Sequence, residues 1–315
     1  MNRRTFLAGG VAAAASTVLP VRPSQAAVQA DSWASLIDLS LCDGCKGKEM
    51  PLCVASCRKG NSHRFPEPDP KELRDYWPQK RHEDWSDKRD DISQLTPYNW
   101  LFVQEVEVAG QRVHIPRRCM HCDNPPCAKL CPFGVMHKTK EGPVWVDPRL
   151  CFGGAKCRTV CPWSIPQRQA GVGIYTYWQE FMPVGAGVMF KCDLCREKLA
   201  DGSTPHCMEK CPKKAMLVGR RDEIFQEARK RQEEYSGYVY GLEENGGTST
   251  VYVSKVDFAA IDQAIRVEDQ ENPLGMNDKE NMLERQKGWA MFSLAAPLVG
   301  GLAAFFATAA KEEDK

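Results

Sequence analysis

Four groups of closely spaced cysteines constrain this chain more than any other feature. They span residues 42–57, 119–131, 151–161 and 192–211, and together they contain all fifteen cysteines of the 315-residue chain. Each group ends in C-x3-C. An odd number of cysteines cannot all pair as disulfides, and C-x2-C spacings suit metal ligation better than bridges. We therefore predict that metal centres held by cysteine organise the fold.

The two middle groups are variants of the bacterial ferredoxin run C-x2-C-x2-C-x3-C-P. In that run three cysteines hold one iron-sulfur cluster, and the fourth ligates the neighbouring cluster. Residues 119–131 have the spacing x2, x4, x3 and are followed by Pro132. Residues 151–161 have the length of the run, but Gly154 stands where a second cysteine is expected. Two such halves predict one unit with two clusters.

Crossed ligation predicts four cluster sites. The nineteen-residue spacer between the middle groups suits a small two-cluster unit, which favours pairing of the inner groups with each other and of the outer groups with each other. Pairing of consecutive groups is the alternative, and spacing alone leaves it open. The predicted ligand sets are Cys42, Cys45, Cys53 and Cys211 (site 1); Cys57, Cys192, Cys195 and Cys207 (site 2); Cys119, Cys122, Cys127 and Cys161 (site 3); and Cys131, Cys151 and Cys157 (site 4).

Site 4 is one thiolate short because of Gly154. A cubane that lacks a protein ligand at one corner tends to lose that iron, so we predict [3Fe-4S] in site 4 and [4Fe-4S] in the other three. The alternative is a fourth [4Fe-4S] cluster completed by a ligand from elsewhere or by water. Four-cysteine zinc sites are the other alternative for such groups. The C-x3-C endings, and the proline that follows three of the groups, favour iron-sulfur.

The remaining composition argues against other functions. A formal net charge of +1 lacks the basic excess of a nucleic-acid-binding protein. The sequence has no phosphate-binding loop, G-x-S-x-G elbow or H-E-x-x-H motif, so we expect no catalytic residues and no substrate site. His121 and His206 stand beside cysteines, but the cysteines suffice as ligands, so we expect both histidines near the clusters or on the surface.

Both ends of the chain carry targeting signals. Arg3-Arg4 precede Phe6-Leu7, an apolar stretch and a small-residue cleavage site near Ala26, a pattern similar to a twin-arginine signal peptide. An ordinary secretory signal is the alternative. Residues 289–310 form an uncharged apolar stretch long enough to span a bilayer, with a buried soluble helix as the alternative. We predict an exported protein anchored to the periplasmic side of the cytoplasmic membrane and in contact with its lipid.

Between the cysteine groups, two hairpins are predicted. One runs through residues 100–115 and turns at 109–111, and the other runs through 135–146 and turns at 140–142. Fifteen of the twenty-five residues in 67–91 are charged, which predicts a solvated surface insertion or, alternatively, a partner-docking arm carrying Trp77 and Trp85. Residues 163–190 predict an irregular covering loop, with a role near a partner or a quinone as the alternative. We expect a helix over 222–234 capped by Asp222 and a strand over 248–256.

The predicted fold class is α+β: nested bacterial ferredoxin-like folds with two clusters each, β-hairpins and loop insertions, plus one C-terminal transmembrane helix. The predicted divisions are a signal peptide (1–30), the first cysteine group with a charged insertion and hairpin (31–118), the central two-cluster unit (119–165), the fourth cysteine group with covering loops (166–258), a polar linker (259–288) and the membrane anchor (289–310).

Four cysteine groups behind a twin-arginine signal resemble the four-cluster electron-transfer subunits of bacterial membrane oxidoreductases, such as the beta subunits of nitrate, formate and dimethyl sulfoxide enzymes. The C-terminal helix narrows the resemblance to the iron-sulfur subunit of hydrogenase-2-type [NiFe]-hydrogenases. The family implies nested pairing of the groups. It also implies a relay of electrons between a catalytic oxidoreductase subunit, here a hydrogenase, and an integral membrane subunit that reacts with quinone. A molybdopterin or multihaem enzyme is the alternative partner, and a zinc-stabilised membrane scaffold is the alternative of another class.

Overall fold

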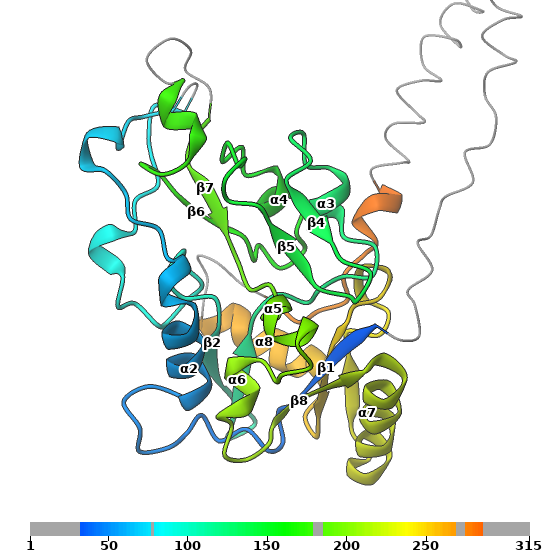
Figure 1. The fold of residues 1–315 in the computed structure, drawn as a ribbon. Coiled ribbons are helices and arrows are strands. Elements are labelled where there is room, and N and C mark those ends of the chain that lie inside the picture. Colours follow the sequence, from blue (N-terminus) through cyan, green and yellow to red (C-terminus); the bar gives the residue numbers. More distant parts are fainter. Residues whose placement is uncertain (1–31, 77–78, 179–184, 269–274, 286–315) are drawn as a thin grey trace, which may run out of the picture.

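The computed structural model describes residues 32–76, 79–178, 185–268 and 275–285 (Figure 1). The predicted signal peptide and membrane anchor lie outside these residues. Within the described part of the chain, no helix is both long and apolar enough to cross a bilayer.

A four-stranded sheet combines a strand from the N-terminal part of the described chain with three strands from its C-terminal part. Its order is β8 (Met216–Arg220), β1 (Trp33–Asp38), β10 (Thr250–Ser254) and β9 (Tyr238–Tyr240). The central strands β1 and β10 are parallel, with Leu36 opposite Val251, whereas β8 and β9 pair antiparallel at the edges. All five residues of β10 are buried, as is usual for a strand covered on both faces. The predicted strand over 248–256 is confirmed as β10, whereas the sequence analysis did not identify β1.

One face of this sheet is covered by α7 (Arg221–Tyr235), as Figure 1 shows. Ala34 and Leu36 of β1 point to this face and pack with Ile224 and Ala228 of the helix, because alternate residues of a strand point the same way. The helix is confirmed, but the predicted cap is wrong. Arg220 is the N-cap residue and no side chain caps the helix, because the chain enters α7 directly from β8, which places Asp222 inside the first turn.

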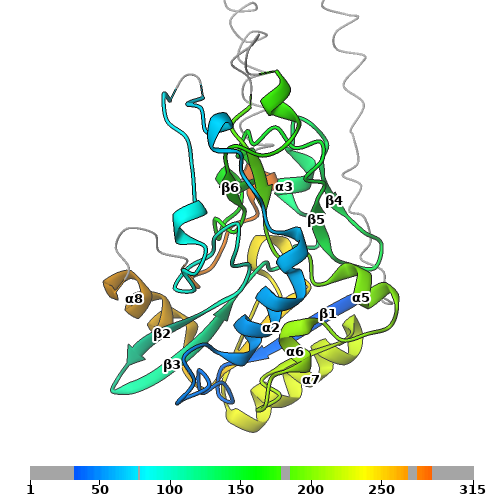
Figure 2. The same ribbon diagram turned by 60° about the vertical axis from the view of Figure 1, so that its left-hand side comes forward.

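The opposite face of the sheet looks toward the cysteine-rich core. Both predicted hairpins are confirmed, as β2 (Phe102–Val108) with β3 (Gln111–Arg117) and as β4 (Met136–Lys138) with β5 (Val144–Val146). Helix α8 (Phe258–Glu268) lies against β2 (Figure 2). The prediction of a polar linker from residue 259 is therefore wrong at its start, since Ile261 and Ile265 are fully buried one turn apart.

Short elements surround the cysteines. In Figure 1 the lower half holds α2 and α6, and the upper half holds α3, α4 and the β4–β5 hairpin. The remaining helices and strands of the described residues are α2 (Leu52–Asn61), η1 (Ser62–Arg64), η2 (Pro70–Glu72), η3 (Ser86–Lys88), α3 (Pro126–Lys129), α4 (Lys156–Thr159), β6 (Gln167–Gln169), η4 (Ile174–Tyr177), β7 (Val188–Phe190), α5 (Arg196–Ala200), α6 (His206–Glu209) and η5 (Glu244–Gly246).

In its described residues the charged insertion (67–91) is loop-like, as predicted, with two one-turn 3-10 helices, η2 and η3. The insertion nevertheless contacts the rest of the protein through ion pairs. Glu83 accepts hydrogen bonds from Arg158 next to Cys157 and pairs with the buried Arg168 of β6. The side chain of Arg168 is only 4% exposed, so this ion pair links the insertion to the region of site 4. Within the described residues, the α+β class of the prediction is confirmed.

Candidate iron-sulfur centres

The cysteines predicted for site 1 line one cavity. Cys42, Cys45, Cys53 and Cys211 line one small cavity together with Val103 of β2 and Met216 of β8. Cys42 and Cys45 come from the loop after β1, Cys53 from the first turn of α2, and Cys211 from the loop after α6. The structure therefore brings together the first three cysteines of the first group and the last cysteine of the fourth group.

The site 2 cysteines meet where α2 packs against α6. Burial raises the pKa of Cys57, and the nearby Cys207, Cys192 and Cys195 raise it further, so these four sulfurs are neighbours. Ser56 Oγ donates a 2.8 Å hydrogen bond to the carbonyl of His206, which fixes the two helices together. A Cβ on Gly60 would lie 2.3 Å from the His206 ring, so only glycine allows this approach.

Site 3 repeats the arrangement of site 1. Cys119, Cys122, Cys127 and Cys161 line one small cavity. Trp163, which is 2% exposed, and Met120 cover it from solvent. Site 3 therefore has an apolar shell. Such a shell limits water access and helps to set cluster potential.

Site 4 has three cysteines and a gap. Cys131, Cys151 and Cys157 line a small cavity, and Gly154 forms part of its wall. A Cβ on Gly154 would find only the edge of Phe133 within 4 Å, at 3.8 Å. Phe133 is 52% exposed and stacks on Phe152.

The four sites lie in a row. Burial and then the neighbouring Cys207 raise the pKa of Cys53, which places site 2 beside site 1. Cys119 raises the pKa of Cys192 across the boundary between sites 2 and 3. Cys161 raises the pKa of Cys157 across the boundary between sites 3 and 4. The C-x3-C endings explain the first and last steps of this row. Each ending places its two cysteines about one helical turn, roughly 6 Å, apart along the chain, so that they serve sites 1 and 2 or sites 3 and 4.

Most of these thiols hold their protons when no metal is bound. Burial raises the pKa of Cys42, Cys161 and Cys207 to about 11. It also raises the pKa of Cys195 and of Cys157 to about 12. Iron must therefore displace protons, as thiolate ligation requires, and each buried set of sulfurs is suited to a group that compensates its negative charge. Among the described residues, no three His, Cys, Asp or Glu side chains converge as the ligands of a single metal ion would.

Several N–H groups point at the sulfurs. Asn61 Nδ2 lies 3.7 Å from Cys57 Sγ, the backbone N of Leu194 lies 3.4 Å from Cys192 Sγ, and Asn245 Nδ2 lies 3.4 Å from Cys122 Sγ. Hydrogen bonds to sulfur are one means by which a protein sets cluster potential. None of these donors was predicted from the sequence. Asn245 in particular is 123 residues from Cys122 in sequence and has no local signal.

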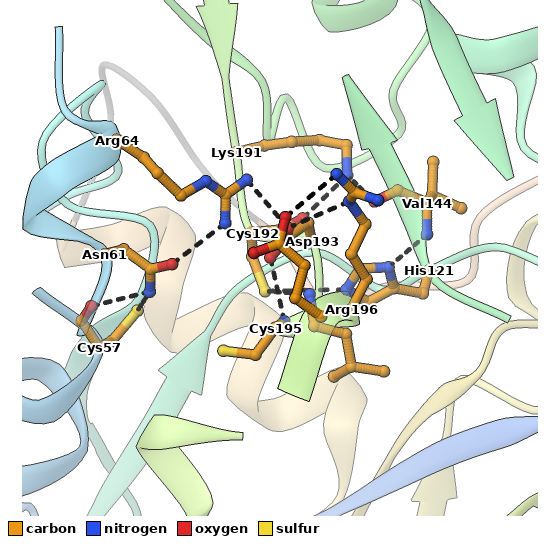
Figure 3. A network of polar contacts seen from close by, with 12 residues as sticks. Cys57, Asn61, Arg64, His121, Val144, Lys191, Cys192, Asp193, Cys195 and Arg196 are labelled. Atoms are coloured by element: carbon orange, nitrogen blue, oxygen red, sulfur yellow. Dashed lines mark hydrogen bonds and ion pairs between the residues drawn. The ribbon is translucent and has the colours of Figure 1, made fainter. Parts of the chain in front are cut away.

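The two histidines singled out from sequence occupy different surroundings. His206 begins α6 and is partly buried, whereas His121 is fully buried between sites 2 and 3, near Cys192 (Figure 3). Burial, followed by the cations Lys191, Arg118 and Lys138, lowers the pKa of His121 well below its usual value. The buried ring lies beside cysteines of two sites, which is one of the two positions expected for these histidines.

Lys191 lies beside the same boundary. Burial alone would lower its pKa, but Cys119, Cys127 and Cys192 outweigh that effect and the pKa is raised. Its side chain lines site 3 and also a neighbouring open cavity of about 350 Å³ with Trp100 and Trp145 in its walls. Lys191 therefore separates site 3 from a solvent-accessible space. Its position directly before Cys192 is a signal in the sequence for this placement.

Comparison with known proteins supports iron-sulfur clusters as the cofactors. Residues 41–135 and residues 110–221 each match a family model described as a 4Fe-4S dicluster domain. The chain belongs to the ferredoxin-type 4Fe-4S dicluster proteins. These matches confirm the resemblance to ferredoxin-type iron-sulfur electron-transfer subunits that the cysteine groups indicate.

Relatives extend the match beyond these domains. A protein of Nitratidesulfovibrio vulgaris is 30% identical over 279 residues, which are 82% of this chain and 66% of the relative. The hydrogenase-2 operon protein HybA of Escherichia coli O157:H7 is 28% identical over 307 residues, which are 83% of each chain. The probable anaerobic dimethyl sulfoxide reductase chain YnfG of Escherichia coli K12 is 39% identical over 108 residues, which are 34% of this chain and 46% of the relative.

Proposed function

We propose that the chain relays electrons through four clusters held by the four cysteine sites. The cofactors are [4Fe-4S] in sites 1 to 3 and [3Fe-4S] in site 4, which supply one-electron transfer when bound. The observation that carries this proposal is the row of sites. In a row, each cluster can exchange electrons with its neighbours, so electrons pass from one end to the other. The nested pairing is supported by three cavities, each lined by cysteines of one predicted set and of no other.

The two ends of the row reach the surface. At site 1, Leu41 next to Cys42 is 38% exposed. At site 4, Phe133 lies two residues after Cys131 and is 52% exposed. Leu150 directly precedes Cys151 and is 54% exposed. Exposed large apolar side chains beside terminal redox sites are suited to contact with partner proteins. We infer that one end faces a catalytic subunit and the other an integral membrane subunit that reacts with quinone.

The relatives favour a hydrogenase as the catalytic partner. The hydrogenase-2 operon protein matches over 83% of both chains, whereas the dimethyl sulfoxide reductase chain matches over about a third of this chain. The second match supports a molybdopterin enzyme as the alternative partner. Affinity purification of the tagged full chain from its native membrane, under anaerobic conditions, distinguishes the two. Co-purification of a nickel-containing subunit supports the first, and that of a molybdenum-containing subunit supports the second.

We further propose export by the twin-arginine route and anchoring by residues 289–310, on the sequence patterns alone. Changing both Arg3 and Arg4 to lysine should retain the protein in the cytoplasm, and normal export would refute the assignment. Deleting residues from 289 onward should abolish carbonate-resistant membrane association. A truncated protein that stays in the membrane would refute the anchor.

The relay itself is tested by removing a middle site. Cys195→Ser weakens site 2 without changing a residue at either end of the row. We expect loss of electron passage from the catalytic partner to quinone, while a soluble dye that accepts electrons at the near end is still reduced. Undiminished quinone reduction in a variant that lacks the site 2 cluster would refute the proposed path.

A further inference from the structure

His121 touches a cysteine of two different sites. Its backbone N–H donates to Cys119 Sγ of site 3 at 3.5 Å, and its ring Nε2 lies 3.7 Å from Cys192 Sγ of site 2 (Figure 3). The residue is fully buried. It therefore joins the two sites by a path that consists of one residue and two contacts to sulfur.

The hydrogen bond at the other ring nitrogen fixes the direction of the ring contact. The backbone N–H of Val144 donates to His121 Nδ1 at 3.0 Å, so Nδ1 is an acceptor and carries no hydrogen. In the neutral ring the hydrogen is then on Nε2, which faces Cys192. His121 is thus a hydrogen-bond donor to a sulfur of site 2, although it lies between two cysteines of site 3.

Lys191 makes the reverse connection. It directly precedes Cys192 of site 2, but its Nζ lies 3.6 Å from Cys119 Sγ of site 3. The same Nζ donates to the carbonyl of Val144, the residue whose N–H holds His121. One residue of β5 therefore positions both side chains. Each of them belongs to the segment of one site and reaches the sulfur of the other.

We propose that His121 and Lys191 are crossed positioning residues that set the potentials on the two sides of the boundary between sites 2 and 3. An N–H group aimed at a ligand sulfur stabilises the more negative reduced form, so its removal lowers the reduction potential. One electron passes between the sites, no covalent bond changes, and both side chains keep their protons. This inference rests on the proposed function, because it requires clusters in both sites.

The test is the potential of each cluster in anaerobically purified full-length protein, measured by a redox titration followed by electron paramagnetic resonance. His121→Leu should lower the potential of the site 2 cluster more than that of site 3. Lys191→Met, which keeps the length of the side chain, should lower the potential of site 3 more than that of site 2. Cys195→Ser and Cys122→Ser assign the two signals to their sites.

Two further variants serve as controls. His121→Gln places an amide N–H near the position of Nε2 and should restore most of the site 2 potential. His82→Leu removes a surface histidine that pairs with Asp75, and it should leave all four potentials unchanged. If His121→Leu loses iron, the Lys191 and glutamine variants still carry the test.

A shift that falls mainly on the cluster of the residue's own segment would overturn the inference, because local distortion would explain it. Unchanged potentials at full iron content would overturn it as well. Neither result affects the proposed relay. That proposal fails instead if the unmodified protein contains no clusters at sites 2 and 3.

Discussion

Gly154→Cys should convert the three-iron centre of site 4 into a four-iron cubane. The glycine lines the same cavity as Cys131, Cys151 and Cys157, at the position where the ferredoxin run has a cysteine. Its φ lies outside the left-handed range, so a side chain introduces no backbone strain. The new Cβ would meet only Phe133, at 3.8 Å, and that ring is 52% exposed and free to shift.

The structure gives the size of the effect. Replacing glycine by a residue that suits the local backbone stabilises a protein by about 0.4–1 kcal/mol through the unfolded chain, so the backbone change should alter the free energy of unfolding by no more than about 1 kcal/mol. The chemical gain is about one iron per chain, from about 15 to about 16, since a cubane holds one iron more than a [3Fe-4S] centre.

The assay is iron analysis combined with electron paramagnetic resonance of the oxidised protein. We expect the oxidised [3Fe-4S] signal to disappear in Gly154→Cys and to remain in Gly154→Ala, which adds the same Cβ without a thiol. If the signal persists in the cysteine variant at full protein yield, site 4 is not built as we describe. If the unmodified protein already lacks the signal and contains about 16 irons, the site 4 cluster is a cubane with a ligand from elsewhere.

Three other predictions follow from single contacts. Glu83→Gln should lower the free energy of unfolding by about 1–3 kcal/mol at pH 7, because it leaves the buried Arg168 without its carboxylate. Burial opposes ionisation of Glu83, but Arg158 and Arg168 outweigh it and lower its pKa. The pair therefore stabilises the fold above the ordinary glutamate pKa, and this stabilisation is lost as the pH falls through the lowered value. The denaturant midpoints of the two proteins should differ at neutral pH and converge in acid, and equal midpoints at neutral pH would show that the pair contributes nothing. Asn245→Leu should lower the potential of the site 3 cluster in a redox titration, since it removes the N–H that faces Cys122 Sγ, and an unchanged potential would contradict the contact. Removal of iron by a chelator should abolish near-ultraviolet circular dichroism and increase the hydrodynamic radius, because the sites join residues as distant as 42 and 211. A compact, ordered iron-free chain would show instead that the core is stable without its clusters.

The spacing of the cysteines carried most of what could be predicted. Local patterns were sufficient to predict the two hairpins and α7, because nearby residues show the alternation of a strand or the 3.6-residue period of a helix. The cysteines that the spacing assigns to sites 1, 3 and 4 line three separate cavities. The pairing of the groups in space matches the nested prediction from the spacer length.

What the sequence did not predict depends on distant partners. Strand β1 is short, and it is defined by its parallel pairing with β10, more than two hundred residues away. Helix α8 was missed because the polar stretch after it dominates the composition, although Ile261 and Ile265 show its buried face. The roles of His121 and Lys191 depend on Val144, whose backbone binds both, and no pattern in adjacent residues indicates that contact.

The central claim is that four cysteine sites in a row hold iron-sulfur clusters. Iron, acid-labile sulfide and zinc measured per chain in intact, anaerobically purified protein test it most directly. We predict about 15 irons and about 16 sulfides per chain, with no stoichiometric zinc. Zinc at about one ion per site without sulfide, or iron sufficient for only about two clusters, would contradict the account.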